Sequence, residues 1–181
     1  MYLVCVLLQA IFVAVSASVL FQDCGSAYDL RTVNIEGCTM RPPCYVTVGE
    51  DVKVNLQFSA GGYFMSRNLD QNVVIDINHL YLPTNVTPER CEIEDCPVEM
   101  GAFTSFTSIM SVPTRVQLNQ RGFLRWRIRN EEGRLVLCYT VLVQTQSPLQ
   151  KLIRRNLLHS LNNAEPNAEL KQSNFTTDVF I

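Results

Sequence analysis

Hydrophobic and polar residues alternate along much of the chain between Cys24 and Gln144. The clearest case is the segment 52–58, in which four apolar residues are separated by polar ones: Val52, Val54, Leu56 and Phe58. A period of two places such residues on one face, so this segment predicts a half-buried β-strand. Similar patterns predict strands at Thr32–Ile35, Tyr45–Val48, Val73–Ile77, Phe103–Ile109 and Leu124–Ile128.

The longest apolar run, Arg134–Gln144, follows Leu124–Ile128 across a short turn at Asn130–Gly133, which predicts a hairpin. No helical period of similar length occurs before Gln144, and about seven short strands with frequent turns predict an all-β sandwich. The second arm of the hairpin is apolar on both faces. An antiparallel strand with one wet face does not have this pattern, so we expect another part of the chain to cover its outer face.

The pattern changes at Ser147, which is a favourable helix cap followed by Pro148 at the first helical position. Apolar residues then recur at helical spacing and predict an amphipathic helix over 147–163. They are Leu149, Leu152, Ile153, Leu157 and Leu161. We expect this stripe to dock on the sandwich, with a helix on a membrane surface or a processing site at Arg154–Arg155 as alternatives. Residues 164–181 predict a flexible tail.

The first 17 residues are apolar and contain no charged side chain. Val15-Ser16-Ala17 supplies the small residues that signal peptidase requires, so 1–17 predicts a cleaved signal peptide and a secreted chain. A membrane anchor is the alternative, but it needs about 20 apolar residues, and the polar pair Gln22-Asp23 ends this run early. The net charge of −2 gives no basic surface for nucleic acid, and we expect a monomer.

Seven cysteines are present, and removal of the leader takes Cys5 away. The remaining six form an even set, as expected for disulfides in an oxidising compartment. Many pairings are possible. Short spacing favours Cys38 with Cys44 and Cys91 with Cys96, which would leave Cys24 with Cys138. Zinc is disfavoured because these spacings are wider than in zinc knuckles.

We find no catalytic or phosphate-binding motif, so the sequence predicts neither an enzyme nor a bound metal or cofactor. His79 has no partner for acid–base chemistry nearby in the sequence. Glu92, Glu94 and Asp95 cluster between two cysteines, which is typical of a solvated loop, although such a cluster can hold calcium. Asn85 and Asn174 begin glycosylation sequons.

The order of the cysteines, with the residues around them, resembles the lipid-recognition (ML) domain family. That family includes the Niemann–Pick type C2 sterol-transfer proteins and the group 2 mite allergens. The resemblance runs from Val19 to Thr145. Its motifs are Phe21–Ser26, Val33–Cys38, Pro43-Cys44, Gly49 before Val52–Phe58, Cys91 with Cys96-Pro97, Val112-Pro113, and Trp126 ahead of Cys138.

The resemblance implies an immunoglobulin-like sandwich of two antiparallel sheets over residues 18–146. It implies the disulfides Cys24–Cys138, Cys38–Cys44 and Cys91–Cys96, and one lipid held between the sheets. The matching pocket positions are Ile35, Val46, Val52, Val54, Leu56, Phe58, Phe106, Val112, Pro113, Thr114, Leu118 and Trp126. Alternation alone favours the other interpretation of these residues, a filled core.

Two departures bear on the ligand. The segment Leu80–Pro88, expected as a loop, has Thr84 near the place of an aromatic residue at the pocket mouth, and Leu118 replaces another. The resemblance therefore predicts a secreted, non-enzymatic carrier of a sterol or another small lipid, without fixing cholesterol. Expected partners are a membrane sterol acceptor outside the cell or in the endosomal or lysosomal lumen. The alternative is an extracellular module that presents lipid to an immune receptor.

Overall fold

The computed structural model describes residues 18–61, 65–91 and 96–163. The predicted signal peptide, the acidic loop with Glu92, Glu94 and Asp95, and the tail with Asn174 lie outside the described residues. None of the helices in the described ranges has the length and apolarity needed to cross a bilayer.

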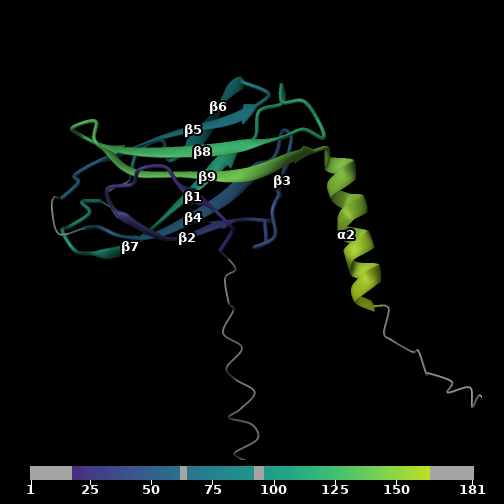
Figure 1. Ribbon diagram of the computed structural model, residues 1–181, viewed down its shortest axis with the longest axis horizontal. Coiled ribbons are helices and arrows are strands. Elements are labelled where there is room, and N and C mark those ends of the chain that lie inside the picture. Colours follow the sequence, from purple (N-terminus) through teal and green to yellow (C-terminus); the bar gives the residue numbers. More distant parts are fainter. Residues whose placement is uncertain (1–17, 62–64, 92–95, 164–181) are drawn as a thin grey trace, which may run out of the picture. The chain divides into compact units, whose positions relative to one another are not determined.

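In this part of the chain nine strands form a sandwich whose two layers are seen edge-on in Figure 1. The strands are β1 (Gln22–Asp23), β2 (Asp29–Ile35), β3 (Cys44–Thr47), β4 (Asp51–Ser59), β5 (Leu69–Ile77), β6 (Leu80–Thr87), β7 (Phe103–Ser111), β8 (Arg121–Asn130) and β9 (Leu135–Gln146). Each predicted strand is present, which confirms the all-β fold.

One layer holds β5, β8 and β9, with β1 and β3 along the edge of β9; the other holds β2, β4 and β7. β6 joins the layers, because Leu80–Thr84 pair with β5 and Asn85–Thr87 pair with β7. All pairings between these strands are antiparallel except that of β3 with β9, which is parallel. The sandwich of two antiparallel sheets is confirmed, with this one parallel edge added.

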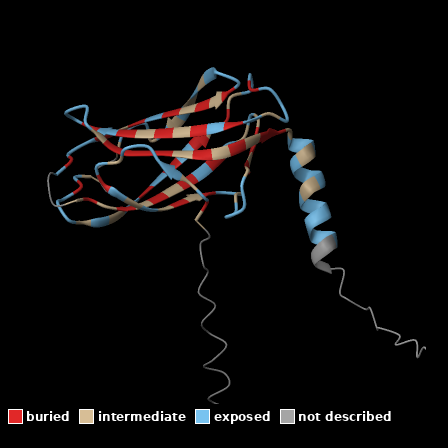
Figure 2. Ribbon diagram, viewed as in Figure 1, coloured by how far each residue is buried: buried red, intermediate tan, exposed pale blue. Residues whose placement is uncertain are grey.

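The alternation in the sequence becomes alternation of burial along the strands, shown as red and paler bands in Figure 2. In β4 the four apolar side chains from Val52 to Phe58 are at most 8 % exposed, and the residues between them lie nearer solvent. Burial of apolar side chains contributes about 25 cal/mol for each Å² removed from water. The facing inner sides of the two layers therefore hold the sandwich together.

Two strands were not expected. Leu80–Thr87 is strand β6 and not a loop, because Asn78 and His79 form a tight turn that folds it back onto β5. Both turn residues have positive φ, 51° and 65°, as a two-residue hairpin turn of the favoured kind requires. His79 is exposed in this turn. The other unexpected strand is β1, which is only two residues long.

The three disulfides are Cys24–Cys138, Cys38–Cys44 and Cys91–Cys96, as the resemblance implied. The first of them helps to explain why β9 is apolar on both faces. Cys24 covers Cys138 on the outer face, and the amide of Ala27 donates to the carbonyl oxygen of Val136 at 3.0 Å. These backbone hydrogen bonds place the segment 24–28 along the edge of β9, so the expectation that the helix covers the outer face of β9 stays a prediction.

The helix forms as α2 (Pro148–Asn163), which agrees with the predicted cap at Ser147. The side chains of its stripe that the structure describes are 47–65 % exposed: Leu149, Leu152, Ile153 and Leu157. The sandwich and this helix are separate compact units. The docking of the stripe on the sandwich stays a prediction.

Candidate lipid-binding site

Nine of the twelve residues predicted to face a pocket lie in the core between the two layers. Each is at most 8 % exposed: Ile35, Val46, Val52, Val54, Leu56, Phe58, Phe106, Val112 and Trp126. They come from five strands in both layers and, for Val112, from the residue directly after β7. Strand pairing places Val54 opposite Ile35 and Leu56 opposite Phe106. Residues far apart in the sequence are thus gathered into one apolar interior.

The other three predicted residues, Pro113, Thr114 and Leu118, lie in the connection between β7 and β8 at one end of the sandwich. Pro113 is half-buried, Thr114 is exposed and Leu118 is 45 % exposed. The amide of Gly49 donates to the carbonyl oxygen of Val112 at 3.0 Å, which holds this connection against the turn before β4. These residues are placed at the rim of the interior.

A polar side chain lies inside the apolar interior and links the two layers. The Gln71 side-chain oxygen on β5 accepts a hydrogen bond from the Trp126 indole N–H at 2.9 Å. Its amide nitrogen donates to Ser108 on β7 at 2.8 Å and to the carbonyl oxygen of Pro88 at 2.7 Å. Gln71 therefore satisfies the one polar atom of Trp126 where no water reaches it, as a buried indole requires.

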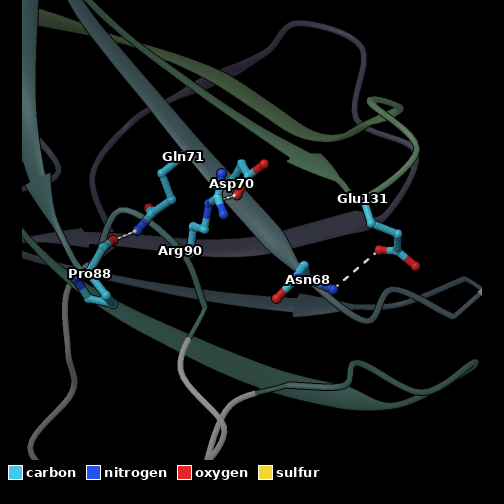
Figure 3. Close-up of polar contacts among 6 residues, drawn as sticks. All are labelled: Asn68, Asp70, Gln71, Pro88, Arg90 and Glu131. Carbon is cyan, nitrogen blue, oxygen red and sulfur yellow. Dashed lines mark hydrogen bonds and ion pairs between the residues drawn. The ribbon is translucent and has the colours of Figure 1, made fainter.

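Figure 3 shows Gln71 reaching Pro88, together with two further polar contacts made near the beginning of β5. Asp70, the residue before Gln71 on β5, forms an ion pair with Arg90 at 2.9 Å. The carboxylate of Glu131 accepts hydrogen bonds from the backbone amides of Arg67 and Asn68. These contacts fasten the beginning of β5, and with it Gln71, to neighbouring loops.

Tyr139 on β9 carries a polar atom in the interior that has no protein partner. Its ring stacks on Trp126, with 5.9 Å between the ring centroids. The side chain is 0 % exposed, and its hydroxyl has no hydrogen-bond partner in the described structure. Burial raises the pKa of Tyr139 well above its ordinary value, so the group is a neutral phenol. A buried hydroxyl without a partner costs about 1–3 kcal/mol.

Among the described residues no three His, Cys, Asp or Glu side chains gather as a metal site. The interior instead combines apolar walls, one satisfied polar hub at Gln71 and one unpartnered hydroxyl at Tyr139. These are the chemical features of the candidate site.

A family model described as the ML domain matches residues 18–145, which is more than half of the chain. The chain belongs to the ML-domain family. This family consists of lipid-binding carriers, and membership accounts for the apolar interior. A search of curated proteins gave no significant match.

Among solved structures, the ML chain is similar to the crystal structure of a Niemann–Pick type C2 protein from the Japanese carpenter ant. The TM-score is 0.59 with 16 % sequence identity, and the match covers 70 % of this chain and 99 % of the ant protein. At this identity the likeness concerns the fold alone. It agrees with the sandwich fold that the family resemblance implied.

Sequence reasoning missed Gln71, Ser108 and Tyr139. Each stands at a strand position where alternation already placed its side chain inward, next to apolar neighbours. Polar residues at inward positions of a strand were therefore the signal, because a buried polar group needs a partner.

We expect Gln71→Ala to lower the free energy of unfolding by about 3 kcal/mol, because it leaves the indole N–H of Trp126 and the carbonyl oxygen of Pro88 buried without partners. Chemical denaturation measures the change. The matched control is Asn72→Ala, the next residue on the same strand, which faces solvent. Equal stability of the two variants would contradict the role of Gln71 as the polar hub.

Tyr139→Phe should raise the free energy of unfolding of the lipid-free protein by about 1 kcal/mol, since it removes an unpartnered hydroxyl and keeps the stacked ring. The matched control is Tyr28→Phe. The Tyr28 hydroxyl is bonded to Ser66 at 2.6 Å, so its removal should lower stability by a similar amount. Thermal unfolding of delipidated protein compares the two, and a loss of stability in Tyr139→Phe would oppose this interpretation.

Proposed function

We propose that this ML protein is a secreted, non-enzymatic carrier that holds one sterol or similar small lipid between its two sheets. The observation that carries the proposal is the gathering of nine predicted pocket residues from both layers into one interior. Family membership supplies the general activity, lipid binding.

In the proposed complex, contacts between core side chains are replaced by contacts between these side chains and the lipid. Burial of about 400 Å² of apolar ligand surface contributes roughly 10 kcal/mol before the costs of ordering are subtracted. The apolar walls contributed by Val54, Leu56 and Phe106 are suited to such a molecule. No reaction is needed for binding or release, which is consistent with a site built without catalytic groups.

The buried hydroxyl of Tyr139 favours a lipid ligand that itself carries a hydroxyl group. Its own hydroxyl has no partner in the described interior, and a ligand hydroxyl that reached it would satisfy two buried groups at once. A purely hydrocarbon ligand would leave this group unpaired at a cost of about 1–3 kcal/mol. Sterols combine the apolar body and the single hydroxyl that this interior fits.

Secretion is supported by the apolar leader and by the three disulfides, which persist in oxidising compartments. In this proposal the carrier is a monomer that acts outside the cell or in the endosomal or lysosomal lumen, where it passes lipid to a membrane acceptor. Asn85 is exposed on β6 and is a glycosylation site in the same proposal, as is Asn174.

Native mass spectrometry of the secreted protein should detect one bound lipid per chain, and a fluorescent sterol should bind to the delipidated form. We expect Val54→Arg and Leu56→Arg to abolish binding, because each places a charge among the apolar walls. The control is Asn55→Arg, which adds the same charge to the outward side of β4 and should bind normally.

Because an interior arginine can also prevent folding, Leu56→Trp provides a second test that fills the interior without adding charge. It should retain the three disulfides and a folded circular-dichroism spectrum while it weakens sterol binding at least tenfold. A folded, ligand-free wild-type protein that takes up neither sterol nor fatty acid would refute the proposal.

The second candidate function is an extracellular module that presents lipid to a receptor. The exposed apolar stripe of α2 favours it, because four adjacent apolar side chains at helical spacing are suited to contact with another protein. Removal of residues 147–181 should then abolish capture of a protein partner and leave sterol uptake unchanged. Loss of sterol uptake in the truncated protein would instead assign the helix to the lipid site.

A further inference from the structure

The outer face of the sandwich has a groove of about 580 Å³ between β1, β8 and β9. Its floor contains three arginines of β8, namely Arg125, Arg127 and Arg129, with Phe123 at one end. This groove lies on the opposite face of β8 from Trp126, so it is separate from the candidate lipid site. The proposed binding of lipid between the sheets does not involve this groove.

The three arginines form a straight row because alternate residues of a strand point to the same side. Alternate positions along a strand repeat about every 6.4–6.8 Å, which is two residues of strand rise. β8 is an inner strand, paired along its length with β5 and β9, so its backbone has no unpaired edge. A partner in the groove would therefore be recognised by the side chains and not by strand addition.

Among the described residues, the arginines of this row form no ion pair with a neighbouring acid. In the described part of the chain, Arg125 and Arg127 have no carboxylate within ion-pair distance. Asp70 is opposite Arg129 in the strand register, but Asp70 is paired with Arg90 at 2.9 Å. Within the described residues, Arg129 donates to the carbonyl oxygen of Gly133, at 2.8 Å, and to no carboxylate.

Acidic residues stand on both sides of the row and limit its width. Asp23 on β1 lies in the groove wall, where its carboxylate accepts hydrogen bonds from the amides of Gly25 and Ser26. On the other side, Asp70 and Asp76 of β5 face outward. A broad anionic surface such as a membrane would press against these carboxylates. A narrow, linear anion would lie along the arginines, with Asp23 the one carboxylate among the residues that line the groove.

We propose that this groove binds an extended acidic segment of a partner protein, with carboxylates at alternate residues. The same-side side chains of an extended peptide also repeat about every 6.4–6.8 Å, so successive carboxylates match successive arginines. Each guanidinium can hold a carboxylate through two parallel hydrogen bonds. Phe123, which is 49 % exposed, gives the end of the segment an apolar contact.

The test uses the full secreted protein and a short fluorescent peptide in which Glu and Thr alternate. We expect saturable binding by fluorescence anisotropy that weakens as salt is added, because the contacts are charged and exposed. A peptide of the same composition with Glu and Thr in blocks should bind more weakly, since its carboxylates do not follow the arginine spacing.

The double variant Arg125→Gln and Arg127→Gln should bind the alternating peptide about tenfold more weakly, the loss expected from two exposed ion pairs. The matched control, Arg41→Gln with Arg67→Gln, removes the same charge from exposed positions outside the groove and should bind as the wild type does. Sterol uptake should be unchanged in both, so failure of this proposal is distinguishable from failure of the carrier proposal.

Equal loss in the two double variants would overturn the proposal, as would equal affinity for the alternating and block peptides. Two further probes identify other occupants. Binding of heparin, or of vesicles rich in phosphatidylserine, that depends on Arg125 and Arg127 without any peptide binding would assign the groove to a polysaccharide or a membrane and would also overturn it.

Discussion

Burial of the Trp126 side chain between the two sheets is the constraint on which much of this structure depends. The ring supplies apolar surface to the core, but its N–H must be paired where water is absent. Gln71 meets this need and at the same time binds to Ser108 in the opposite sheet. One buried glutamine thereby fixes the relative position of β5, β7 and β8, and the apolar interior is built around this polar link.

The strand β8 serves two surfaces because its residues alternate strictly. Leu124, Trp126 and Ile128 pack inward and are 0 % exposed, while the intervening arginines face the outer groove. A shift of one residue in the register of β8 would exchange the two sets and place charges in the core. The same constraint that holds the sandwich closed therefore keeps the arginine row outside.

Much of the fold could be predicted from the sequence, because alternation and cysteine spacing are local signals. Val52–Phe58 and Leu124–Ile128 show period two so clearly that the strands and their inward residues follow. β6 could not be predicted in this way, because Pro83 within it and Pro88 directly after it indicate a loop. Only its pairing with strands of both layers makes it a strand. The partners of Gln71 likewise come from distant segments, which no local pattern connects. The assignment of inward residues to a lipid pocket came from family resemblance, because alternation alone does not distinguish a pocket from a filled core.

The disulfide between Cys24 and Cys138 has a consequence for the order in which the domain is made. Its two cysteines are 114 positions apart, so in a secreted chain the first cysteine of the mature protein would enter the lumen long before its partner is synthesised. Cys38 and Cys44 become available in the meantime, close behind Cys24. In such a secreted chain, correct pairing would depend on Cys24 remaining reduced, or on a disulfide isomerase, until β9 emerges and β1 can join it.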